Sequence, residues 1–86
     1  MPTISRFYGI VIQMYWDERH GPHFHALYAE YRAQISILNG EILRGTLPPR
    51  ASRFAREWLE QHRAELLENW NRARTGQELI QIEGLE

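Results

Sequence analysis

The sequence contains no cysteine and no long apolar segment, and each absence excludes a class of protein. Without cysteine there is no disulfide and no thiolate-ligated metal site. No apolar run approaches the roughly 18 residues that a membrane-spanning helix needs. The opening Met1-Pro2-Thr3-Ile4 does not have the pattern of a secretory signal peptide. We therefore expect a cytoplasmic protein with no membrane partner.

Lysine is also missing, and the charge of the chain is nearly balanced. The formal net charge of −1 gives no bulk electrostatic attraction to nucleic acid. All ten basic residues are arginine, a side chain that binds phosphate and carboxylate in two-point geometry and stacks on aromatic rings. This usage fits either a compositional bias of the gene or a surface built for such ligands.

The length and the apolar pattern predict one small folded domain that spans residues 1–86. Hydrophobic residues make up 43% of the chain, as in an ordinary globular protein. β-Branched and aromatic residues predict a strand from Phe7 to Trp16. Its alternation places Ile10, Ile12 and Met14 on one face.

A second strand is expected from His23 to Tyr28, and the turn after it sets the register of the sheet. If Ala29-Glu30 is a two-residue hairpin loop, the next strand pairs with this one residue by residue. In that register Phe24 and Ala26 point into the core. His23 and His25 then lie on the opposite, polar face.

Asn39-Gly40 is the strongest hairpin signal of the chain and predicts a type I′ turn. Such a turn would set Ile37 opposite Ile42 on the core face. The predicted fold class is α+β: an antiparallel β-meander of about four strands, with a C-terminal helical segment packed on one face.

The helical segment is predicted to begin after Pro48-Pro49 and to run to Arg74. Its apolar positions recur at intervals of three and four, and they include Trp58 and Trp70 as core residues. A straight helix of this length would be about 37 Å long and would overhang so small a domain, so a break near His62-Arg63 is expected. Leu79–Ile82 could add a last short strand at the sheet edge.

Three of the four histidines are clustered, and they are the candidate metal ligands: His20, His23 and His25. His23 and His25 stand two apart, so their rings share one side of a strand. Imidazole suits zinc, copper, nickel or iron, and Asp17 or Glu18 could add an oxygen. The simpler alternative is a pair of exposed histidines on a polar face, with no cofactor at all.

The same face supports two further interpretations. With Arg32 nearby, His23 and His25 could serve as acid and base in RNA cleavage, while the guanidinium stabilises the phosphate. Alternatively the face only binds, by stacking bases or by docking a protein. The binding candidates are Tyr15, His20, His23, His25, Arg32 and Gln34.

Several stretches resemble a known bacterial family: Met1–Phe7, Pro22-His23-Phe24-His25-Ala26, Leu47-Pro48-Pro49-Arg50 and the segment from Trp58 to Trp70. The chain is similar, essentially end to end, to the family known as domain of unknown function 4160. That family has no established activity, so no catalytic residues follow from the resemblance. It implies a stand-alone bacterial protein that is often encoded beside a second small protein, an arrangement similar to toxin–antitoxin loci.

From these observations we expect a binding component of a toxin–antitoxin-like two-protein system. Its expected partner is a small protein encoded nearby, and RNA is a possible second ligand. The alternative, from another class, is a histidine-dependent enzyme: a metal-assisted hydrolase or a metal-free ribonuclease that uses His20, His23, His25 and Arg32.

Overall fold

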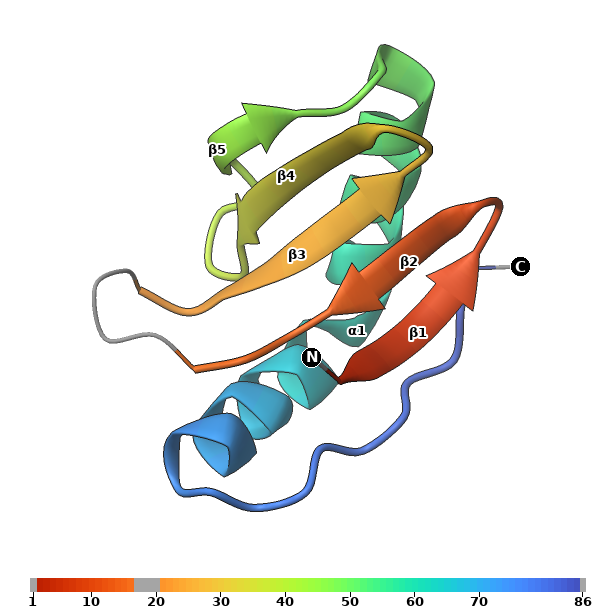
Figure 1. Ribbon diagram of the computed structural model, residues 1–86. Coiled ribbons are helices and arrows are strands. Elements are labelled where there is room, and N and C mark those ends of the chain that lie inside the picture. The colour runs from red at the N-terminus through yellow and green to blue at the C-terminus, as the bar shows by residue number, and fades with distance from the viewer. Residues whose placement is uncertain (1, 17–20, 86) are drawn as a thin grey trace.

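The computed structural model describes residues 2–16 and 21–85, and within them five strands form an antiparallel sheet that is backed by one helix (Figure 1). The elements are β1 (Thr3–Phe7), β2 (Ile10–Gln13), β3 (His23–Tyr28), β4 (Tyr31–Ser36), β5 (Ile42–Thr46) and α1 (Pro49–Arg74). The strands lie side by side in chain order. The predicted α+β meander is therefore confirmed, with five strands instead of about four.

The additional strand arises because the segment predicted as one strand from Phe7 to Trp16 is interrupted by a turn. Tyr8 and Gly9 have φ angles of 50° and 80°, and a type I′ turn requires positive φ at both of its central residues. The chain reverses there, and Phe7 pairs with Ile10. The prediction of an uninterrupted strand was wrong, because a glycine inside a strand-like run marked the turn.

The hairpin between β3 and β4 has the predicted register. Its two-residue loop is Ala29-Glu30, and Phe24 pairs with Ile35 while His25 pairs with Gln34. Phe24 and Ala26 are fully buried beneath the helix. The alternation of inner and outer side chains along β3 is thus confirmed.

The connection between β4 and β5 differs from the predicted type I′ turn at Asn39-Gly40. Of these two residues only Gly40 has a positive φ, 76°, and its N–H donates to the Ser36 carbonyl at 2.9 Å. The Asn39 side-chain oxygen accepts the Glu41 N–H at 2.9 Å. These bonds close a longer loop. The predicted hairpin between β4 and β5 is therefore present, but the predicted type I′ turn was wrong.

The longer loop also changes the partner of Ile42. Ile42 pairs with Ile35, not with Ile37, and its side chain is 40% exposed. Ile37 is fully buried instead, and its carbonyl accepts a hydrogen bond from Nε of Arg63 at 2.8 Å. The loop is thereby held against the helix.

Helix α1 contains the expected break, at His62, where φ is −125° and ψ is 22°. The break near His62-Arg63 that the helix length predicted is therefore confirmed. Trp58 and Trp70 are both buried, as predicted. The Trp58 ring lies 5.3 Å from that of Phe7 and 5.6 Å from that of Phe24, so it joins two strands to the helix.

The C-terminal tail passes along α1 to the edge of β1 (Figure 1). The amide of Asn69, which is buried in α1, forms two hydrogen bonds with the backbone of Ile80, at 2.8 and 2.9 Å. The Ile82 N–H donates to the Ile4 carbonyl at 2.8 Å. No strand is assigned within the described tail, so the predicted strand at Leu79–Ile82 was wrong. The tail nevertheless covers the β1 edge, whereas every residue of β5 is exposed.

Within the described residues, no helix is both long enough and apolar enough to cross a membrane.

Candidate functional site

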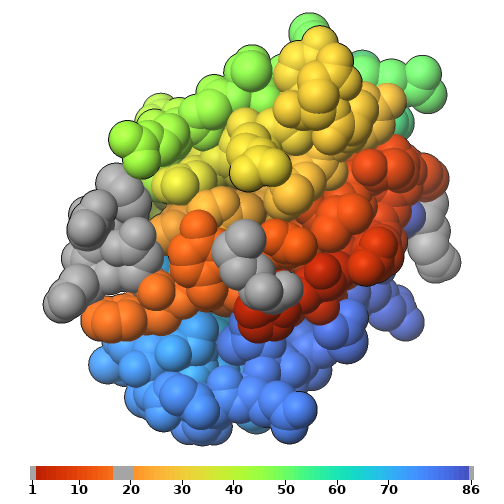
Figure 2. All heavy atoms as spheres, viewed as in Figure 1, coloured from red at the N-terminus to blue at the C-terminus, as the bar shows by residue number. Residues whose placement is uncertain are grey.

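The face of the sheet that α1 does not cover carries most of the predicted site residues, and we call it the outer face. Figure 2 shows this face, with the strands in front of the helix. Strand register places two rows of side chains on it. The rows are Gln13, His25, Gln34 and Arg44, and Arg6, Val11, Leu27 and Arg32.

His25 lies at the centre of the outer face. Its ring stacks on that of Tyr15, with centroids 4.5 Å apart and planes inclined by 18°. Gln13 on β2 and Gln34 on β4 are its cross-strand neighbours. Arg32 is the diagonal neighbour, at the roughly 7–8 Å that separates such positions in an antiparallel pair. The structure therefore brings together Tyr15, His25, Arg32 and Gln34, as predicted.

His23 differs from the prediction that both strand histidines face away from the core into solvent. It alternates with Phe24 as expected, yet its exposed fraction is 1%. The Trp70 ring lies 5.1 Å from the imidazole, and the His25 ring lies 5.3 Å away. Trp70 therefore covers His23 at the end of the sheet, whereas His25 is half-buried.

A hydrogen bond fixes the orientation of the His23 ring. Nδ1 lies 2.9 Å from the Gly21 carbonyl oxygen, and a carbonyl can only accept, so Nδ1 carries the proton. The lone pair of the neutral ring is then on Nε2.

Two glutamine side chains beside His25 have incomplete hydrogen bonding. The Oε1 atoms of Gln13 and Gln34 are buried, and neither has a hydrogen-bond partner among the residues that the structure describes. A buried acceptor without a donor costs about 1–3 kcal/mol.

The acidic residues of the molecule are unevenly divided between the sheet and the helix. None of the five strands contains an acidic residue, whereas α1 contains four glutamates beside its six arginines. Arg6, Arg32 and Arg44 are exposed on the outer face. Within the described ranges none of these three arginines forms an ion pair, while two arginine–glutamate ion pairs lie on α1. The outer face is therefore basic although the chain as a whole is not.

Sequence patterns alone missed two of these arginines. The position of Arg6 depends on the turn at Tyr8-Gly9, and that of Arg44 depends on an irregularity in the pairing of β4 with β5. The glycine at position 9 was the one signal that could have placed Arg6.

The predicted metal site falls partly outside the described residues, because His20, Asp17 and Glu18 lie between positions 16 and 21. Among residues 2–16 and 21–85, no three histidine or acidic side chains are grouped so that they could hold a metal ion.

Exposed apolar side chains lie at the β5 edge of the sheet. Ile42 and Leu43 belong to β5 and Leu38 to the loop before it, and Ile42 pairs with the buried Ile35, so it lies on the side of the sheet that α1 covers. The C-terminal tail does not reach this edge (Figure 1). Exposed apolar side chains beside an uncovered strand edge are typical of a surface that another chain can cover.

Comparison with known proteins gives one match. Curated proteins and solved structures give none. The model of the family described as "Domain of unknown function (DUF4160)" matches residues 9–71. This range contains β2 to β5 and nearly all of α1, and thus most of the outer face. The chain belongs to the DUF4160 family.

Proposed function

We propose that this protein is the binding component of a toxin–antitoxin-like two-protein system, and that its outer face docks an acidic surface of a small partner protein. The observation that carries the proposal is the set of three exposed arginines, one each from β1, β4 and β5, on a sheet that contains no acidic residue. Arginines without ion-pair partners are available to a carboxylate on another molecule.

The surroundings of the arginines favour a protein over RNA as the main ligand. Val11 and Leu27 lie half-buried between Arg6 and Arg32 on the outer face. Arginine, aromatic and apolar groups together are enriched at the centre of protein interfaces. The net charge of −1 does not attract a polyanion over long distances.

The family context supplies the candidate partner, which is the small protein encoded beside this one. Binding of the two purified proteins can be measured by isothermal titration calorimetry. The test variant carries Arg32→Glu and Arg44→Glu together, which turns an attraction for acidic groups into a repulsion. The matched control is Arg74→Glu, because Arg74 is exposed at the far end of α1 and forms no ion pair within the described residues.

We expect the double variant to bind the partner at least about tenfold more weakly than the parent, because the loss of complementary charges weakens binding at an interface. Arg74→Glu should bind like the parent. Equal affinities of all three proteins would refute the outer face as the binding face. If a mixed-sequence single-stranded RNA bound more tightly than the partner protein, we would conclude that the ligand of the outer face is RNA.

A second candidate function, a histidine-dependent enzyme, is supported by the geometry of the histidine pair. The His23 and His25 rings are 5.3 Å apart, and a ring whose Nδ1–H donates to a backbone carbonyl is oriented as metal-ligating histidines are. We propose hydrolysis of RNA, with or without a divalent metal, as the activity of that rival. Cleavage of an RNA substrate that His25→Ala abolishes would support it, as would zinc that raises the melting temperature of the parent but not of the variant.

A further inference from the structure

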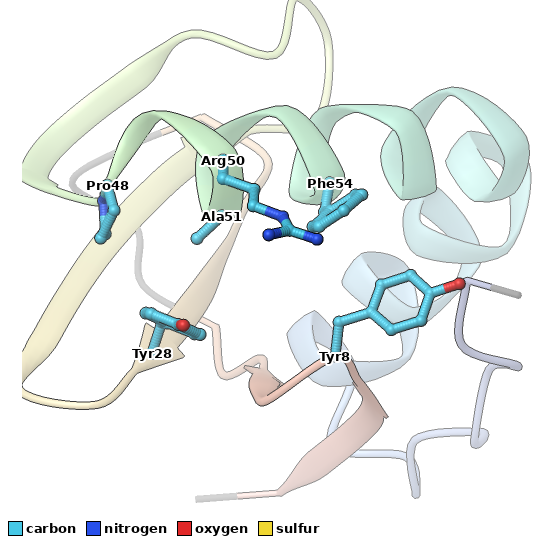
Figure 3. A pocket seen from close by; sticks show the side chains of 6 residues that line it. All are labelled: Tyr8, Tyr28, Pro48, Arg50, Ala51 and Phe54. Atoms are coloured by element: carbon cyan, nitrogen blue, oxygen red, sulfur yellow. The ribbon is translucent and has the colours of Figure 1, made fainter.

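A cavity of about 410 Å³ lies away from the outer face, where the ends of the strands approach the first turns of α1 (Figure 3). Its lining residues are Tyr8, Tyr28, Pro48, Arg50, Ala51 and Phe54. The volume is within the range of about 300–1,000 Å³ that is usual for small-molecule sites. None of these residues belongs to the two rows of the outer face.

Three aromatic rings from three separate elements border the cavity. Tyr8 comes from the turn between β1 and β2, Tyr28 from the end of β3, and Phe54 from α1. The Tyr8 and Phe54 rings are 5.0 Å apart and inclined by 51°, and Tyr28 lies on the other side of the space (Figure 3). Together they offer the faces on which a planar ring stacks.

Arg50 is the one charged residue that lines the cavity within the described chain. Its side chain extends toward Phe54 and Tyr8 (Figure 3), with Cζ 5.5 Å from the Phe54 ring centroid. Arg53 approaches the same ring at the same distance. In the described ranges neither arginine forms an ion pair, and the first turn of α1 contains no acidic residue. Two guanidinium groups beside an aromatic platform favour a phosphate as the ligand.

The turn at Tyr8-Gly9 places the Tyr8 ring at this cavity. The Tyr8 φ of 50° is left-handed, a region that glycine and asparagine adopt far more readily than tyrosine. The side chain gains little burial there, because it remains 52% exposed. Strained residues are often found at functional sites, and Tyr8 has an exposed aromatic ring at the rim of the cavity.

We propose that this cavity binds a nucleotide, with its base stacked on Tyr8 and its phosphate paired with Arg50. The aromatic rings select a planar group, and the arginines select an anion attached to it. The nucleotide is either a free mononucleotide or one residue of an RNA strand, since both present the same base and phosphate. This site is separate from the protein-binding face, so failure of either proposal leaves the other standing.

The experiment titrates AMP, GMP, CMP and UMP, each with its matching nucleoside, into the full chain and follows binding by calorimetry. The two test variants are Tyr8→Asn, which suits the left-handed turn position, and Arg50→Gln, which removes the charge but keeps a polar side chain. Arg74→Gln is the matched control. Circular dichroism confirms that each variant is folded.

We expect at least one mononucleotide to bind with a Kd of about 10 μM to 1 mM and its nucleoside to bind more weakly. Tyr8→Asn and Arg50→Gln should each weaken binding about tenfold, whereas Arg74→Gln should not change it. A short oligonucleotide that binds through the same residues more tightly than the mononucleotide identifies an RNA strand as the source. Weaker binding of the oligonucleotide identifies the free nucleotide.

Three results would overturn the proposal. One is the absence of binding for all four mononucleotides at concentrations up to about 5 mM. Another is binding that survives both test variants, which would place the nucleotide elsewhere on the protein. The third is equal affinity for nucleotide and nucleoside, which would show that Arg50 does not contact the phosphate.

Discussion

The two faces of the sheet differ in what covers them, and β3 shows the difference within a single strand. Phe24 and Ala26 point under α1 and are fully buried. His25 and Leu27 alternate with them and are only half-buried on the outer face. The inner face provides the buried apolar area that stabilises the fold. The outer face contributes less to stability, so its side chains are available to contact another molecule.

The largest effect on stability is expected from the inner face, at Trp58. This ring packs on Phe7 and Phe24, and its Nε1 donates to the Glu83 carbonyl at 2.7 Å. Trp58→Ala should cost about 3–5 kcal/mol, a large share of the roughly 5–10 kcal/mol typical of a domain of this size. Urea unfolding measures the loss. Trp70→Ala should cost about as much by the same reasoning, and a parent-like midpoint for either variant would show that its ring is not a core residue.

A smaller loss is expected where the tail is held against α1. Asn69→Ala removes both hydrogen bonds to Ile80 and should cost about 1–3 kcal/mol. The amide of Ile80 should then exchange hydrogen faster with solvent. Asn71→Ala is the control, because that side chain is exposed two positions away. If the two variants were equally stable, the tail would not depend on Asn69.

A gain in stability is expected at the tip of the β3–β4 hairpin. Ala29 has a φ of 52°, and the left-handed conformation costs a residue with a Cβ about 1–2 kcal/mol. After the entropy cost of glycine, Ala29→Gly should stabilise the protein by about 0.5 kcal/mol. Ala64→Gly, at an exposed position inside α1, should instead destabilise it by about 1 kcal/mol. Thermal melting curves give both signs, and a loss at position 29 would contradict the turn geometry.

The smallest effect on stability is expected on the outer face. Arg32→Ala and Arg44→Ala remove exposed side chains that have no ion pair within the described residues, so each should change the free energy of unfolding by less than about 0.5 kcal/mol. A loss comparable to that of Asn69→Ala would mean that these arginines stabilise the fold, and would weaken the contrast between the two faces.

The parts of the fold that were predicted correctly depend on local rules. The alternation along β3 follows from the two-residue loop at Ala29-Glu30, and the break at His62 follows from the length of the helix. Tyr8 was missed as a turn residue because tyrosine rarely adopts a positive φ. The turn at Asn39-Gly40 was mispredicted because side-chain bonds within the loop, together with the contact from Arg63, outweigh the preference of that dipeptide.

The candidate site was predicted in part for the same reason. Tyr15, His25, Arg32 and Gln34 share a face because strand periodicity and one turn determine their positions. The burial of His23 depends on Trp70, which is distant in the sequence and reaches the ring only through the packing of α1. The basic character of the outer face depends on Arg6, which the turn at Tyr8-Gly9 positions, and on Arg44, which follows an irregularity in the pairing of β4 with β5.

The central claim is that the outer face, and not the helical side, contacts the partner protein. The most direct test is an NMR titration of the full chain with the small protein that we propose as its partner, following the Nε–H signals of Arg32 and Arg44 and the ring signals of His25. The account predicts that these signals shift as the partner is added. No shift is expected for the buried indole N–H of Trp58, or for the backbone amides of Glu60 and Glu68 on the exposed side of α1. Shifts confined to the helix amides, with the arginine and His25 signals unchanged, would contradict it.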